Sequence, residues 1–171
     1  MTNMILNDQQ LTAIVVLDMT DIINEVADQL LKKLKDSGGF IETIVYGAGS
    51  PSWYPRQKES GGLLGAYDKT DATVAGTTIT AEVGEHPERM TFDPENFIHG
   101  SYYWKDGTTD IRKILSDIIT EGTSGPLFGD TGFWMSPRDF WQPLLDMLES
   151  GEVDTMIESA FTKRKIKFIK M

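Results

Sequence analysis

The chain has 171 residues and a formal net charge of −10, with 16 Lys and Arg, 26 Asp and Glu, two His and no Cys. This length favours one domain that folds without covalent cross-links. The lack of Cys excludes disulfides, zinc–cysteine sites, iron–sulfur clusters and thiol nucleophiles. The negative charge argues against a general nucleic-acid binder, because affinity for the phosphate backbone needs a cationic surface. With no apolar run of 18 residues and no basic-then-apolar leader, we expect no membrane span and no secretion signal.

Residues 8–36 are predicted to form a long N-terminal helix. Apolar side chains recur there at intervals of three and four, from Leu11 to Leu34, and this spacing places them on one helical face. The pair Gly38-Gly39 is the expected stop. The run 14–17 would also suit a strand, in which case a shorter helix would start after it. Apolar residues beyond one face would pack either within the chain or on another subunit.

The middle of the chain predicts a small antiparallel sheet. Residues 37–62 are rich in Gly, Ser, Pro and aromatic residues, so we expect mostly irregular structure, with a weak strand pattern over 40–46. A hairpin follows, with its turn at Ala75-Gly76, because Gly accepts positive φ at low cost. Its second strand is predicted over 78–83, where apolar and polar residues alternate. A third short strand is expected within 84–100.

Helices are predicted for the C-terminal part of the chain. The first covers 109–121 and ends at a glycine. The second starts at a Ser-Pro pair, covers 136–149 and is expected to kink at Pro143, which lacks an amide donor. The third lies near 154–163, and a short strand could follow over 165–170.

These elements predict one α+β domain over residues 1–171, with a mainly antiparallel sheet packed by the long N-terminal helix and two or three C-terminal helices. Residues 1–18 and 163–171 are candidate assembly arms. The last nine residues hold five cations and no acid, which leaves 11 cations against 26 acids in residues 1–162. This basic tail is either a solvated terminus or a segment that docks on the acidic body of a neighbouring copy.

No pattern in the sequence points to catalysis. His86 and His99 stand in loop-like contexts without the helical spacing of a metal pair, and we expect both on the surface. A glycine-rich stretch at 47–50 lacks the lysine of a phosphate loop. The close carboxylate pairs are expected to be solvated, namely Asp18 with Asp21 and Glu85 with Glu88. We therefore expect no enzyme, no cofactor and no metal ion.

Several short motifs follow one another in an order that carries information. A helix ends in Lys32-Lys33-Leu34-Lys35, a loop delivers Tyr54-Pro55-Arg56, and Gly61-Gly62-Leu63 enters a strand; after the hairpin come Ile119-Thr120-Glu121-Gly122 and Pro137-Arg138-x-Phe140-Trp141. In this order, over roughly residues 20–165, the chain resembles the head-to-tail joining or tail-completion proteins from the neck of long-tailed bacteriophages. The loops at 84–108 and 122–136 are longer than is usual in that family.

The resemblance implies a structural protein of the virion neck that is assembled in the host cytoplasm. Its implied partners are further copies of itself in a ring, often of six, together with head connector or stopper proteins and the tail tube protein. Genome DNA would pass through the lumen without specific binding. A head-completion stopper or a minor capsid protein is the alternative within this class. Outside it, the alternative is a host small-molecule-binding or hydrolytic α+β domain.

A closed ring needs unlike patches on each copy, because one patch meets a different patch on the next copy. Aromatic loops and the basic tail would supply such patches. The candidate interface residues are Trp53, Tyr54, Arg56, Phe128, Phe133, Trp134, Arg138, Lys163, Arg164 and Lys165. Two alternatives stay open: Trp53 and Tyr54 could cover the core edge, and the segment around Arg138 could serve helix capping and core packing.

Overall fold

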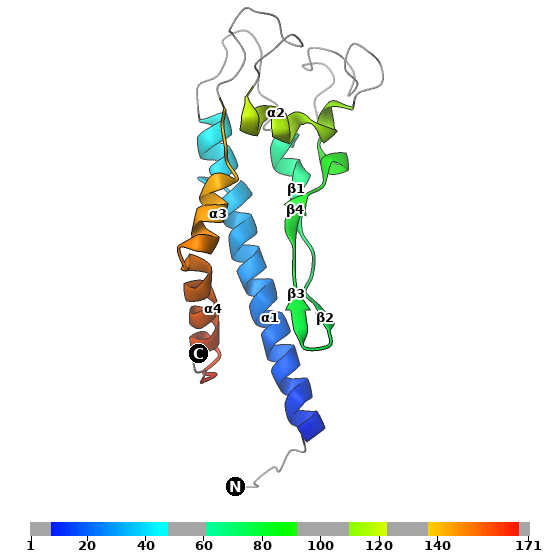
Figure 1. Ribbon diagram of the computed structural model, residues 1–171, viewed down its shortest axis with the longest axis vertical. Helices are drawn as coiled ribbons and strands as arrows, with labels where there is room; N and C mark the ends of the chain where they lie inside the picture. Colours follow the sequence, from blue (N-terminus) through cyan, green and yellow to red (C-terminus); the bar gives the residue numbers. More distant parts are fainter. Residues whose placement is uncertain (1–7, 48–60, 92–109, 123–136, 168–171) are drawn as a thin grey trace, which may run out of the picture.

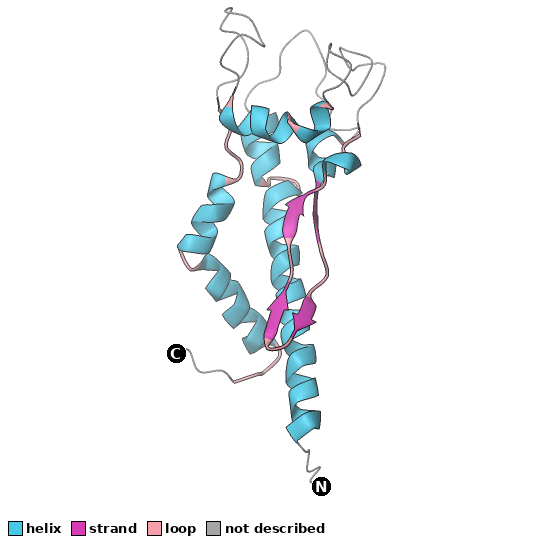
Figure 2. Ribbon diagram, turned by 45° about the vertical axis from the view of Figure 1, so that its right-hand side comes forward, coloured by secondary structure: helices cyan, strands magenta, loops and turns pink. Residues whose placement is uncertain are grey.

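A computed structural model describes residues 8–47, 61–91, 110–122 and 137–167. Over these residues the fold is α+β, as predicted, with a long N-terminal helix, small antiparallel sheets and C-terminal helices. Helix α1 (Asp8–Lys35) lies along the long axis of the molecule (Figure 1). The strands lie along one side of α1, and helices α3 (Gln142–Glu149) and α4 (Glu152–Lys163) lie along another (Figures 1 and 2).

Helix α1 is continuous over its 28 residues, so the run 14–17 is helical and the strand alternative is wrong. Its buried side chains are Ile22, Val26, Ala27 and Leu34, spaced as one helical face requires. Three lysines in the last turn face the negative end of the helix dipole. Gly38 follows with φ +80°, the left-handed conformation that ends many helices.

The strand predicted over 40–46 is wrong, because Ile41–Tyr46 forms a π-helix. The amide of Gly47 donates to the carbonyl of Glu42 at 2.7 Å, which is the five-residue step of that helix. Ile41 and Val45 are buried in the core, and Ile44 packs against it. A strand would have turned Ile44 to the face opposite Ile41. Burial of all three therefore selects a helical turn over the weak alternation.

The strands form a long ribbon beside α1. Strand β1 (Tyr67–Lys69) pairs with β4 (Val83–Glu85), and β2 (Thr73–Ala75) pairs with β3 (Thr78–Thr80), both antiparallel. Ala75 faces Thr78, so the turn is Gly76-Thr77, one residue later than predicted, with Gly76 at φ +63°. The strand predicted over 78–83 is interrupted at 81–82.

The strand expected to start at Gly61-Gly62-Leu63 is preceded by a 3₁₀-helix, Gly62–Ala66. Gly61 and Gly62 have φ values of +107° and +45°, which side chains disfavour. The amide of Gly62 donates to the carbonyl of Thr91 at 2.8 Å. This glycine pair therefore turns the chain sharply at the start of the 3₁₀-helix that leads into β1.

Two of the predicted C-terminal helices end where they were expected to end, although the first begins only at Leu115 and not at 109. Helix α2 (Leu115–Glu121) follows a short 3₁₀-helix, Ile111–Lys113, and ends at Gly122, as predicted. Helix α4 begins two residues earlier than expected, after Gly151 at φ +81°. The described part of the predicted final strand is not a strand: Lys165 has φ +58°, and residues 168–171 lie outside the described residues.

The prediction for the helix over 136–149 is wrong at its start. Helix α3 begins at Gln142, and Pro143 lies in its first turn, where a missing amide donor costs nothing. The expected kink is therefore absent from this described segment. Asp139 Oδ1 accepts hydrogen bonds from the amides of Trp141 and Gln142, at 3.0 and 2.9 Å. These amides open the helix, so Asp139 satisfies donors that the helix leaves free.

The main core lies where the C-terminal end of α1, the π-helix, β1, α2 and residues 140–141 meet. Tyr67 and Phe140 are fully buried. The Tyr67 ring stands edge-on to Phe140 and Trp141, with centroids 5.7 and 5.2 Å apart. Phe140 and Trp141 are therefore packing residues, which confirms the core-packing alternative for this segment.

Candidate assembly surface

The structure describes four of the ten predicted interface residues: Arg138, Lys163, Arg164 and Lys165. The other six lie outside the described residues, namely Trp53, Tyr54, Arg56, Phe128, Phe133 and Trp134. The prediction that the aromatic loops form contact surface therefore stays a prediction.

Arg138 connects two parts of its own chain. Its amide donates to the carbonyl of Ile119 at 2.9 Å, and its Nη1 donates to the carbonyl of Val45 at 3.2 Å. Val45 lies in the last turn of the π-helix and Ile119 lies in α2. The half-buried Arg138 thus supports the core from inside the subunit.

The basic end of α4, by which we mean residues 163–167, is bound to an acid of α1. Glu25 contacts Lys163 Nζ through Oε1 at 3.0 Å and Arg164 Nη1 through Oε2 at 2.6 Å. Hydrogen bonds from Arg164 and then Lys163 lower the pKa of Glu25. We call these three residues the Glu25 clasp. Two cations expected to dock on a neighbouring copy are therefore engaged within their own chain, although Lys163 remains 72% exposed.

Sequence reasoning missed Glu25: the helical spacing of acids on α1 marks the side of the helix on which Glu25 lies, but not its pairing with α4. Asp18, Asp21 and Glu25 are three and four residues apart, so they share one side of the helix. We call them the acidic stripe. Since the end of α4 lies at Glu25, the stripe continues past the clasp toward the N-terminus of α1. Asp21 is exposed and Asp18 is half-buried.

The N-terminal part of α1, residues 8–21, includes the turns that extend beyond the end of α4 and the tip of the β2–β3 hairpin (Figures 1 and 2). We call it the projecting segment. None of its side chains that the structure describes is buried. Ile14, Val15 and Leu17 are 44%, 51% and 67% exposed. The apolar surplus predicted from the sequence is therefore uncovered in the single chain.

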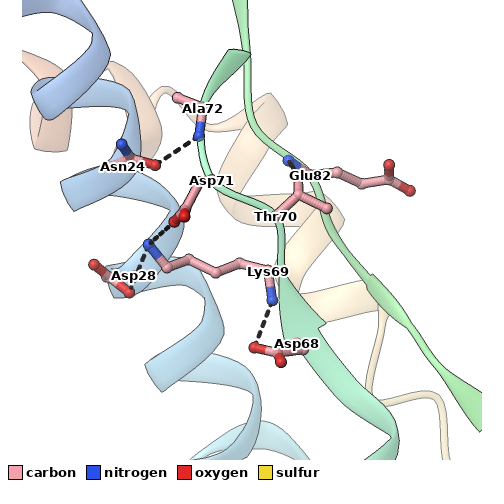
Figure 3. A network of polar contacts seen from close by, with 8 residues as sticks. All are labelled: Asn24, Asp28, Asp68, Lys69, Thr70, Asp71, Ala72 and Glu82. Carbon is pink, nitrogen blue, oxygen red and sulfur yellow. Dashed lines mark hydrogen bonds and ion pairs between the residues drawn. The ribbon is translucent and has the colours of Figure 1, made fainter.

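A polar network anchors α1 just after the projecting segment (Figure 3). Asn24 Oδ1 accepts a hydrogen bond from the amide of Ala72 at 2.8 Å, and Asp28 Oδ1 lies 3.1 Å from Lys69 Nζ. Thr70 and Glu82 join the two edges of the ribbon through hydrogen bonds of 2.8 and 3.0 Å. The ribbon and the Glu25 clasp thus contact the same two turns of α1, which gives the projecting segment a fixed base.

A second polar group lies inside the fold. The hydroxyls of Tyr67 and Ser116 are 2.6 Å apart, and Glu85 faces Tyr67 across the β1–β4 pair. Glu85 is half-buried, so the prediction of a solvated Glu85 is wrong. Its Oε1 is buried without a hydrogen-bond partner among the described residues. Burial, and further the nearby Asp117, raises the pKa of Glu85, while a hydrogen bond with Ser116 acts in the opposite direction.

The described residues contain no cluster of three His, Asp or Glu side chains arranged to bind a metal ion. His86 Nδ1 lies 3.5 Å from Glu88 Oε1, and His99 lies outside the described residues. Within the same ranges, no helix has the length and apolar character that a bilayer crossing requires.

Comparisons with protein-family models, with curated proteins and with solved structures find no match for this chain.

Proposed function

We propose that the chain is a structural subunit of the neck of a long-tailed bacteriophage, in the role of a tail-completion or head-to-tail joining protein. In this role it forms a ring with copies of itself between the head connector and the tail tube. The role of such a subunit is to join parts of the particle, so it needs neither catalysis nor a cofactor.

One observation supports this proposal above the others: the projecting segment presents Ile14, Val15 and Leu17 to solvent on an anchored helix. A contiguous patch of exposed apolar side chains often marks a site where another molecule binds. A helix that is fixed at its base and uncovered at its end is suited to packing on another molecule.

The charge distribution also suits a ring. The chain carries a basic end and an otherwise acidic body, which are the unlike patches that head-to-tail contacts around an axis require. An acidic ring would also repel the phosphate backbone, so that DNA passes through the lumen without adhering.

The proposal is tested on particles produced by the genome that encodes this chain. Purified infectious particles should contain the chain, and antibody against it should label the neck in electron micrographs. Deleting its gene should leave filled heads and separate tails that do not join. Purified particles that lack the chain would refute the proposal.

Separated heads and tails distinguish the positions within the virion. When joining is blocked, heads and tails can be resolved on a density gradient. A tail-completion protein should migrate with the tails, whereas a stopper should remain on the heads and a minor capsid protein should be spread over the head shell.

A further inference from the structure

We propose that the projecting segment of one copy docks against the basic end of α4, residues 163–167, of a second copy. This inference rests on the proposed function, because it names the contact that closes the ring. Two observations on the described residues support it: the opposite charges of the two surfaces and the exposed apolar side chains of the projecting segment.

The two surfaces have opposite charge. The projecting segment holds Asp8, Asp18 and Asp21 and no Lys or Arg, whereas residues 163–167 hold four cations and no acid. Lys165 and Lys167 are exposed. Complementary charges of this kind fix register and reject wrong partners.

The Glu25 clasp shows how the two surfaces fit. Within one chain, the basic end of α4 already binds the last acid of the stripe, with the Arg164–Glu25 distance at 2.6 Å. Asp21 and Asp18 continue that stripe by one and two helical turns. Lys165 and Lys167 of a second copy, which are exposed and are not part of the clasp, can pair with these acids one step further along the helix.

Apolar side chains lie beside the charges on both surfaces. Ile14 and Leu17 each lie four residues before an acid of the stripe, so they adjoin it on the helix surface. Half-buried Phe161 and Ile166 lie next to the cations, and the amide of Ile166 donates to the carbonyl of Phe161 at 3.0 Å. The contact would therefore cover apolar surface as well as pair charges.

The placement of the two surfaces suits neighbours in a ring. The end of α4 and the N-terminal end of α1 point toward the same end of the molecule (Figures 1 and 2). Copies that stand side by side in the same orientation can thus bring the basic end of one against the projecting segment of the next. Such a contact is head-to-tail and can close around an axis.

A charge exchange tests the contact. Sedimentation velocity over a concentration series in low salt measures self-association of the full chain, and the same variants are tested for complementation of the gene deletion. Asp18→Lys with Asp21→Lys, or Lys165→Glu with Lys167→Glu, should each weaken association about tenfold or more. The four changes together should restore it. Glu121→Lys with Glu149→Lys, at exposed sites elsewhere, is the control that matches the charge change of the Asp→Lys pair, and it should leave association intact.

Thermal unfolding confirms that each variant is folded before its association is interpreted. Association and complementation that are unchanged in the two charge variants would overturn this contact, and so would failure of the fourfold variant to recover. Either result would leave the neck function standing if particles contain the chain. If particles lack the chain while the charge exchange behaves as expected, the function fails and the contact stands.

Discussion

Glu25 joins the first helix to the end of the last, so its role depends on the tertiary fold. We expect Glu25→Gln to reduce the free energy of unfolding at pH 7 by about 1 kcal/mol or less, the range of partly exposed ion pairs. Chemical denaturation measures this difference. The exposed Glu121, changed to Gln, is the control and should have no such effect.

The pH dependence of this difference has a fixed sign. The pKa of Glu25 is lowered in the folded state from 4.5, so the folded chain binds the proton less readily than the unfolded chain. The stabilisation is fully present above 4.5 and is lost as the pH falls through the folded-state pKa. Wild type and Glu25→Gln should therefore converge in stability in acid. A gap that persists at pH 2 would contradict the ion-pair explanation.

Glu85 should behave in the opposite way. Burial raises its pKa above 4.5, so the folded state favours the protonated carboxyl. Stability contributed by this group is present below 4.5 and declines as the pH rises through the folded-state pKa. Glu85→Gln should raise the melting temperature at pH 7.5 and change it little at pH 4. A lower melting temperature at pH 7.5 would show that ionised Glu85 has a stabilising partner.

The conformation or burial of an individual residue could be predicted only where it depends on the neighbouring residues in the sequence. Gly122 is a helix stop in both sequence and structure, because its positive φ of 78° is a conformation that glycine adopts at low cost. Burial of Glu85 could not be predicted, since it depends on the register that places Glu85 opposite Tyr67. The same holds for Arg164, whose partner Glu25 is 139 residues away.

Among the elements, α3 depends at its start on the side chain of Asp139. Asp139→Ala should lower the free energy of unfolding by about 1 kcal/mol, because two amides at the start of α3 lose their acceptor. Asp139→Asn should retain most of this free energy, since the side-chain oxygen of Asn can still accept hydrogen bonds from the two amides. Thermal or urea unfolding measures both. If Asp139→Ala is neutral, the amides have another acceptor.

Helices in which apolar residues recur at helical spacing could be predicted from the sequence, whereas the secondary structure of short segments could not. The spacing of apolar residues predicted α1 almost to its ends, because one face of it packs along the molecule. The π-helix and the start of α3 departed from the prediction because packing decided both. Ile41, Ile44 and Val45 contact one core, and Phe140 is buried before α3 begins.

At the scale of the whole molecule, residues 8–17 of the projecting segment should be dispensable for folding. A chain that starts at Asp18 lacks Ile14, Val15 and Leu17, none of which is buried, and retains the Glu25 clasp. We expect its melting temperature to stay within a few degrees of the full chain, because core burial is unchanged. Its self-association should weaken in sedimentation velocity, because the apolar part of the proposed contact is removed while Asp18 and Asp21 remain. A large loss of stability would show that the segment packs on its own chain.

The overall α+β class and the asymmetry of charge were both readable from the sequence. The candidate assembly surface could be predicted only in part. The basic end was predicted, whereas the acid it binds and the uncovered part of α1 depend on where α4 ends along α1. That endpoint is set by the packing of α3 and α4 on α1, and no local pattern encodes it.

The order in which the ribosome makes these elements has a consequence for the Glu25 clasp. Helix α1 is synthesised first, whereas Arg164 lies 139 residues further along the chain. Contacts so distant in sequence form late in folding, because the intervening chain must first be brought together. A polypeptide whose translation stops before residue 164 has no clasp and no complete basic end. In the proposed contact, premature termination products should therefore offer a full-length copy a projecting segment but no basic end, and so interrupt the ring.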